Sequence, residues 1–189
     1  MATMKLTLLR HAQTEGSLRD LYYGASDIPA MESALRELHR RSAEYPAALH
    51  YYTSGLQRTE QTLQAIYGPV EHTRLPGLQE MDFGDFEMRS YEDLKNDPAF
   101  TEWEKDSDHL PCPHGESLPQ LIERNVAAIE RVLATGEDSV CIIHGGVTAN
   151  LMVHWFGKDR HFFYRKPGTG YTVTFADGKP VSYRLVPEE

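Results

Sequence analysis

Short apolar runs alternate with amphipathic stretches along most of this 189-residue chain. The apolar runs lie at 5–9, 48–53, 70–75 and 139–143, and their length is typical of buried strands. Amphipathic, helix-like stretches lie at 32–45, 54–67, 117–134 and 147–156, and the second and third begin with capping-box patterns at Ser54 and Ser117. The alternation predicts an α/β fold with a mostly parallel sheet and helices on both faces. The segment 171–186, around Asp177-Gly178, predicts a hairpin.

Composition and charge narrow the function classes. An apolar content of 40% and a charged content of 25% are ordinary for a globular protein. No apolar stretch has the roughly 20 residues of a membrane-spanning helix. A formal charge of −9 argues against a nucleic acid or an anionic membrane as partner. With two cysteines in unlike settings, Cys112 and Cys141, and no signal-peptide pattern, we expect a cytoplasmic protein.

Two apolar runs end in histidine. Arg10-His11 follows the first run, and His144-Gly145-Gly146 follows the run at 139–143. Open α/β sheets bind ligands beyond the carboxyl ends of their strands, so both histidines are expected at such a site. The guanidinium of Arg10 can hold an oxyanion through two hydrogen bonds, and an adjacent histidine can act as a nucleophile.

Two further segments fit the same chemistry. Arg58 lies in the first turn of the helix expected after Ser54, where free N–H groups already favour an anion. Glu80 follows a turn-like Pro76-Gly77 in a stretch rich in aromatic residues, where a carboxyl group can hold a proton and donate it. Two strand-end histidines, two arginines and one acid are a consistent set for phosphoryl transfer through a phosphohistidine. Because the cations can neutralise the phosphoryl oxygens, the set needs no metal and no cofactor.

Taken together and in this order, Arg10-His11, Arg58-Thr59, Glu80 and His144-Gly145 resemble the histidine phosphatase superfamily, in its phosphoglycerate-mutase-like branch. The resemblance implies a three-layer sandwich with a mixed, mainly parallel sheet. It implies His11 as nucleophile, Glu80 as proton donor, and Arg10, Arg58 and His144 around the phosphate. The stretch 80–89 most resembles the α-ribazole phosphatase group.

Several positions extend or modify this pattern. Relatives usually carry glycine at the position of Ala12 and asparagine at that of Ser17, where the amide touches phosphate. Ser17, Gly145, Tyr23 and Arg89 complete the expected substrate contacts, and no residue is assigned to a metal. We expect a single domain over 1–189, in which an excursion at about 87–113 covers the active-site end.

The expected activity is hydrolysis of a small phosphorylated metabolite, with α-ribazole 5′-phosphate as the candidate. The alternatives are a phosphoglycerate mutase, a sugar-phosphate phosphatase, or a catalytically weak member of the family that binds a phosphorylated ligand. The phosphorylated metabolite is the expected partner, without nucleic acid or membrane. The chain is expected to be a monomer or a homodimer.

Overall fold

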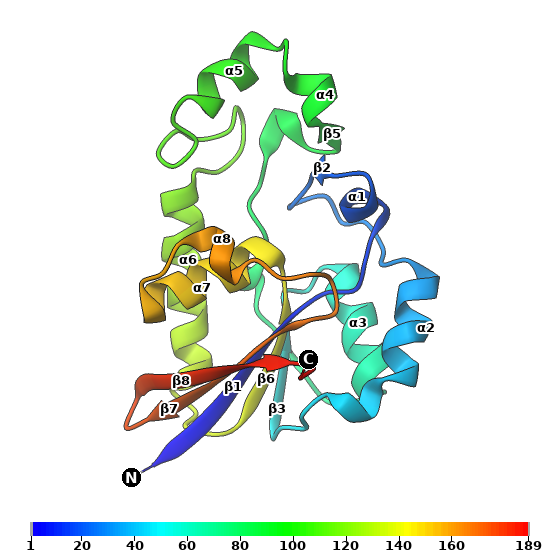
Figure 1. Ribbon diagram of the computed structural model, residues 1–189, viewed down its shortest axis with the longest axis vertical. Helices are drawn as coiled ribbons and strands as arrows, with labels where there is room; N and C mark the ends of the chain where they lie inside the picture. The colour runs from blue at the N-terminus through cyan, green and yellow to red at the C-terminus, as the bar shows by residue number, and fades with distance from the viewer. Residues whose placement is uncertain (1, 189) are drawn as a thin grey trace.

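A computed structural model describes residues 2–188. Its main sheet has six strands (Figure 1). The strand order is β4-β3-β6-β1-β7-β8. Strands β4, β3, β6 and β1 are parallel neighbours, whereas β7 and β8 are antiparallel, so the sheet is mixed and mainly parallel as predicted. Their bounds are β1 Thr3–Arg10, β3 His50–Thr53, β4 Thr73–Arg74, β6 Ser139–Ile143, β7 Gly170–Ala176 and β8 Lys179–Val186. No helix of the described chain is long and apolar enough to cross a membrane.

Helices cover both faces of the sheet because alternate residues of β1 point in opposite directions. Leu6 and Leu8 face a core shared with α6 and α7, whereas Leu9 faces a second core shared with α2 and α3. Figure 1 shows α2 and α3 on one side of the sheet and α6, α7 and α8 on the other. These helices are α2 Glu32–Arg40, α3 Gln57–Tyr67, α6 Leu118–Leu133, α7 Gly145–Phe156 and α8 Arg160–Phe163.

The excursion forms the top of the molecule in Figure 1. It contains β5 (Arg89–Ser90), α4 (Tyr91–Leu94) and α5 (Pro98–Glu104). Strand β5 pairs with β2 (Leu21–Tyr22), which follows the short helix α1 (Glu15–Leu18). Buried aromatic and aliphatic side chains of the excursion, among them Phe100 and Leu94, belong to the larger core. The excursion is thus packed on the sheet domain through apolar contacts.

Several sequence-based boundaries are confirmed. The strand at 139–143 has the predicted bounds and is buried throughout. Ser117 caps α6 and shares a reciprocal capping box with Gln120. The terminal hairpin turns at Asp177-Gly178, both of which have positive φ, as a two-residue turn between right-handed twisted strands requires.

Other boundaries differ from the predictions. Helix α2, predicted over 32–45, ends at Arg40. Tyr45 instead turns inward, and its hydroxyl donates to the Gly168 carbonyl oxygen. Strand β4 spans two residues instead of six, and β3 begins at His50 rather than Ala48. Helix α7 begins at Gly145, two residues earlier than predicted.

The capping box predicted at Ser54 is wrong. Helix α3 begins at Gln57, and its N-cap, Leu56, offers no side-chain hydrogen bond. The free N–H of Gln57 instead donates to the carboxylate of Asp27, 2.7 Å away. A cap supplied from a distant loop leaves the Ser54 hydroxyl available for another partner.

Candidate active site

The parallel pairing of β1 with β6 brings the two strand-end histidines together. Arg10 is in register with Ile143, and the His11 N–H continues the ladder by donating to the Ile143 carbonyl oxygen at 2.9 Å. The rings of His11 and His144 consequently lie 5.2 Å apart, centre to centre. Both side chains are almost completely buried. The sequence motifs at 10–11 and 144–145 therefore meet at one point.

The ring of His11 is held in one orientation. Its Nδ1 lies 2.7 Å from the Ala12 carbonyl oxygen, which can only accept, so Nδ1 carries the proton and Nε2 keeps its lone pair. Burial, and then the positive charges of Arg58 and Arg10, place the pKa of His11 well below its usual range. A neutral imidazole with a free nitrogen is the form that a nucleophile needs.

The alanine at position 12 fits its backbone. Ala12 lies outside the left-handed region, its side chain is buried in the smaller core, and its N–H donates to Thr62 Oγ1 at 2.8 Å. The conformational freedom of glycine is therefore not needed here.

Each of the two arginines is anchored on one side by main-chain oxygen. Arg58, which is fully buried, donates to the carbonyl oxygens of Gly24 and Ser26 at 2.7 Å each. Arg10 donates to the carbonyl oxygen of Arg165 at 2.7 Å. Neither arginine forms an ion pair with a carboxylate within residues 2–188, and the Nε atoms of both are buried without a hydrogen-bond partner there. Two buried cations with unused donors favour an anion between them.

Aromatic rings cover the same two cations. The guanidinium of Arg10 lies 5.0 Å from the ring centre of Tyr164, and that of Arg58 lies 5.1 Å from that of Tyr23. The Tyr23 hydroxyl also accepts a hydrogen bond from Thr14. The rings hold the guanidinium planes without neutralising their charge.

His144 contacts Ser54, the residue released from its predicted capping role. His144 Nε2 lies 2.8 Å from Ser54 Oγ, whereas Nδ1 is buried without a partner in the described chain. Burial, and then the charges of Arg58, His11 and Arg10, lower the pKa of His144 well below its usual range. His144 is thus a neutral, hydrogen-bonding group.

Glu80 lies across the cavity on an irregular segment. One of its carboxylate oxygens accepts from the Gly146 N–H at 2.8 Å and the other from the Met81 N–H at 3.1 Å. A side chain at position 146 would bring its Cβ to 2.6 Å from the Glu80 carboxylate, so only glycine allows this approach. The start of α7 thereby fixes Glu80.

These groups line one cavity of about 940 Å³. Of the residues predicted for the site, the cavity wall includes Arg10, His11, Ser17, Tyr23, Arg58, Glu80, His144 and Gly145. The hydroxyl of Ser17 is engaged locally, because it exchanges hydrogen bonds with Thr14 in the capping box of α1. Arg89 lies elsewhere: it pairs with Asp97 at 3.3 Å and is not part of the wall.

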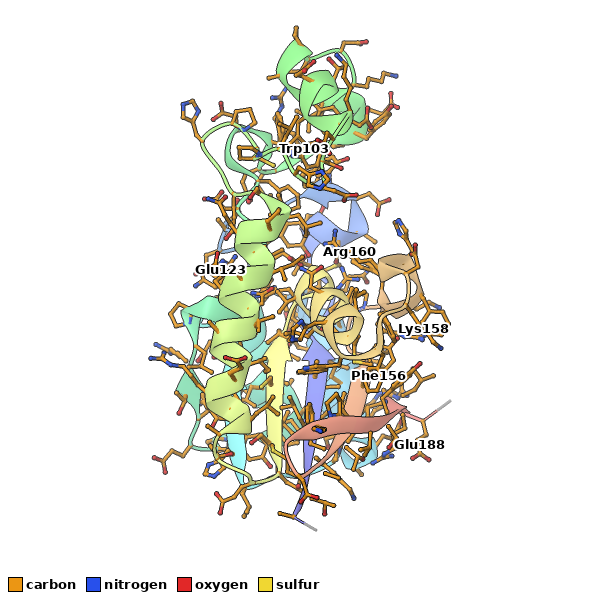
Figure 2. The ribbon with its side chains drawn as sticks, turned by 90° about the vertical axis from the view of Figure 1, so that its left-hand side faces the viewer. Trp103, Glu123, Phe156, Lys158, Arg160 and Glu188 are labelled. Carbon is orange, nitrogen blue, oxygen red and sulfur yellow. The ribbon has the colours of Figure 1, made fainter. Side chains whose placement is uncertain are left out.

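The cavity wall also contains residues that the sequence did not single out. Arg160 begins α8, Tyr164 follows that helix, and Trp103 comes from the excursion. Figure 2 shows Trp103 in the upper part of the molecule, which the excursion forms, and Arg160 below it. Trp103 packs against the larger core and also lines the wall. No motif in the sequence around Tyr164 marks this residue as part of the site.

The described residues offer no group of three or more histidine, cysteine, aspartate or glutamate side chains arranged to hold a metal ion. Both cysteines are buried and unpaired.

Comparison with known proteins identifies the family. The model of the histidine phosphatase superfamily (branch 1) matches residues 6–186. The chain belongs to this superfamily. It is 30% identical over 160 residues to an adenosylcobalamin/alpha-ribazole phosphatase of Salmonella typhimurium, covering 79% of this chain and 78% of the relative.

A 2,3-bisphosphoglycerate-dependent phosphoglycerate mutase of Bradyrhizobium diazoefficiens is 31% identical over 206 aligned positions, covering 98% of this chain and 93% of the relative. The crystal structure of a putative alpha-ribazole-5'-P phosphatase from Escherichia coli superposes with a TM-score of 0.87 at 22% identity, over 97% of this chain and 95% of that one. The superposition shows the same fold, and phosphatases and mutases are similarly close in sequence.

Removing either arginine should weaken oxyanion binding. We expect Arg10→Ala and Arg58→Ala to bind vanadate more weakly and to lower kcat by about 10²–10³-fold, by analogy with loss of one oxyanion donor. Arg36→Ala, which removes an exposed arginine on α2, is the control and should bind vanadate normally. Unchanged vanadate affinity in both site variants would contradict the assignment of the clamp.

The two buried histidines should make stability depend on pH. In the unfolded chain histidine becomes protonated at about pH 6.5. The folded protein keeps His11 and His144 neutral to lower pH, because their pKa values are lowered. Lowering the pH therefore favours the unfolded state. The free energy of unfolding should therefore fall as the pH drops below about 6.5, by up to about 1.4 kcal/mol per pH unit for each histidine. Urea unfolding of wild type, His11→Asn and the exposed-site control His154→Asn measures this. Only His11→Asn should flatten the dependence of the free energy of unfolding on pH. The same pH dependence in all three proteins would contradict the assignment of a neutral, buried His11.

Proposed function

We propose that this protein is a metal-independent phosphomonoesterase that works through a phosphohistidine at His11. The observation that supports it most directly is the pair of buried arginines, which have no carboxylate partner among residues 2–188 and flank a neutral histidine with a free ring nitrogen. In a protein with a formal charge of −9, such a site selects a phosphate ester by local and not by overall charge.

The reaction has two balanced steps. His11 Nε2 attacks phosphorus, the bond from phosphorus to the ester oxygen breaks, and Glu80 transfers its proton to the departing oxygen. The Glu80 carboxylate then accepts a proton from water as that water attacks the phosphohistidine, which releases phosphate and restores the imidazole. Arg10, Arg58 and His144 hold the phosphoryl oxygens throughout.

The opposite end of the cavity favours an uncharged, aromatic leaving group. Its wall there includes Tyr22, Phe83, Tyr91 and Trp103, together with the acidic Asp108. The cations of the excursion are paired with carboxylates and lie outside the wall: Arg89 with Asp97, Lys95 with Glu92, and Lys105 with Glu102.

Beside these residues a second acidic group, as in a phosphoglycerate, would meet an acid and aromatic faces; the further arginine of the wall, Arg160, belongs to α8 and not to the excursion. The wall instead fits a heterocycle on a sugar phosphate, and the similarity to alpha-ribazole phosphatases makes α-ribazole 5′-phosphate the candidate substrate. We place the protein in the cytoplasm, where such a metabolite would be available.

The substrate proposal is tested with a panel of phosphate esters. Metal-depleted enzyme in excess chelator should hydrolyse α-ribazole 5′-phosphate with a higher kcat/KM than sugar phosphates, and should neither hydrolyse nor isomerise 3-phosphoglycerate appreciably. The control is the same panel assayed without chelator, where the order of kcat/KM values should be the same. A strict requirement for divalent metal, or mutase turnover, would overturn the proposal. Tight vanadate binding without any turnover would favour a phospho-ligand-binding protein.

The covalent intermediate should form on His11. Brief reaction with phosphate-labelled substrate should leave label that survives alkali and is lost in acid, as an N–P bond requires. His11→Ala should lose both the label and turnover, whereas His154→Ala, at an exposed position, should keep both. Full activity in His11→Ala would refute the mechanism.

Glu80→Gln should discriminate between leaving groups. It keeps the shape of the side chain but removes the transferable proton, which an alkoxide needs and a nitrophenolate does not. We expect kcat/KM for an alkyl phosphate to fall by about 10²–10⁴-fold, the usual contribution of a general acid, and to change little for p-nitrophenyl phosphate. Equal losses on both substrates would show that Glu80 only positions the ligand.

A further inference from the structure

Arg124, on α6, lies behind the segment that carries Glu80. Its guanidinium makes five hydrogen bonds. Three reach carbonyl oxygens of that segment, at 2.8 Å to Glu80, 2.7 Å to Gln79 and 3.1 Å to Gly77. The other two form a bidentate pair with the Glu116 carboxylate at 2.7 and 2.8 Å.

Two neighbours attach the same segment to α6. Glu116 also accepts a hydrogen bond from the Asp82 N–H at 3.3 Å, and Asn125 donates to the Gly77 carbonyl oxygen at 2.8 Å. Glu123, which precedes Arg124, is exposed and labelled on α6 in Figure 2. Arg124 therefore belongs to the inward side of this helix.

Packing alone does not fix the Glu80 segment. Only a single 3₁₀ turn, Pro76–Leu78, precedes Glu80, and no strand contains it. The large cavity lies on one side of Glu80, and a second cavity of about 410 Å³, lined also by Gln79, Glu116 and Arg124, lies on the other. The neighbouring Leu78 and Met81 are buried in the larger core, but the Glu80 side chain lies at the cavities, so hydrogen bonds decide where its carboxylate lies.

We propose that Arg124, held by Glu116, is a positioning residue for the proton donor Glu80. Arg124 fixes the main chain of Glu80 from behind, and the Gly146 N–H fixes the carboxylate from the front. The planar guanidinium suits this task because it can bind three carbonyl oxygens and a carboxylate at fixed angles, which an ammonium group cannot. This inference rests on the proposed role of Glu80 as general acid.

The prediction is a loss that depends on the leaving group. Misplacing a catalytic group by about 1 Å can lower a rate about 10²-fold, so Arg124→Met should lower kcat/KM for an alkyl phosphate by about that factor. For p-nitrophenyl phosphate, which needs no acid, kcat/KM should change little. Arg124→Lys, which keeps the charge but loses the fork, should fall between wild type and Arg124→Met. Arg131→Met, an exposed arginine on the same helix, is the matched control.

A double-variant cycle separates positioning from general stability. If Arg124 acts through Glu80, adding Arg124→Met to Glu80→Gln should cause little further loss on the alkyl phosphate. Equal losses on both substrates in Arg124→Met and Arg124→Lys, or fully additive losses in the cycle, would overturn the proposal.

The Glu80→Gln arm distinguishes the two hypotheses. If Glu80→Gln shows its leaving-group-dependent loss and the Arg124 variants do not, the positioning role fails while the proposed function stands. If Glu80→Gln itself shows no such loss, the acid assignment fails, and the positioning role fails with it. Should Arg124→Met not fold, Arg124→Lys and Glu116→Gln carry the same comparison.

Discussion

The parallel pairing of β1 with β6 is the constraint on which the site depends. Strand β6 is buried throughout and β1 is buried from Leu6 to Arg10, so a shift of one residue would move every side chain to the opposite face and is strongly disfavoured. The register sets Arg10 beside Ile143, and the next residue of each strand is a histidine. His11, the proposed nucleophile, and His144 are thus positioned by hydrophobic burial and a main-chain ladder, before any side-chain interaction contributes.

Around this pair the protein keeps positive charge without neutralising it. A buried guanidinium is costly unless its donors are satisfied, yet a carboxylate partner would remove the attraction for phosphate. Arg58 resolves this conflict by donating to main-chain oxygens of residues 24 and 26. The loop is held in turn by Glu87, whose carboxylate accepts from the N–H groups of Gly24, Ala25 and Ser26. Glu87 therefore supports the cation through the backbone.

The features predicted from the sequence are those determined locally. Apolar runs ending in histidine predicted β1, β6 and the meeting of His11 with His144, because strand length, burial and register follow from nearby residues. A serine three residues before a glutamine has the local pattern of a cap, but the hydroxyl of Ser54 contacts His144, 90 residues away in sequence. The contributions of Tyr164 and Arg124 come from chain segments that only the tertiary fold brings to the site, and no local pattern encodes them. The charge state of His144 likewise depends on burial and on neighbours that spacing alone does not show.

The two ends of the cavity are built from different kinds of structure, and this separates chemistry from selectivity. Strand ends and helix starts form the phosphate end, where a main-chain ladder and buried hydrogen bonds fix each group. The excursion forms much of the other end, where Tyr22 packs edge-on against Phe100 and Phe86 packs against Trp103, at ring separations of 5.5 and 5.6 Å. Because Tyr22 and Trp103 line the wall and also pack against the core through Phe86 and Phe100, their positions are set by packing and not by the ligand. Substitutions in the excursion can therefore change which leaving group fits while the phosphoryl-transfer groups stay in place. Such a division accounts for a family whose members are named both phosphatases and mutases on one fold.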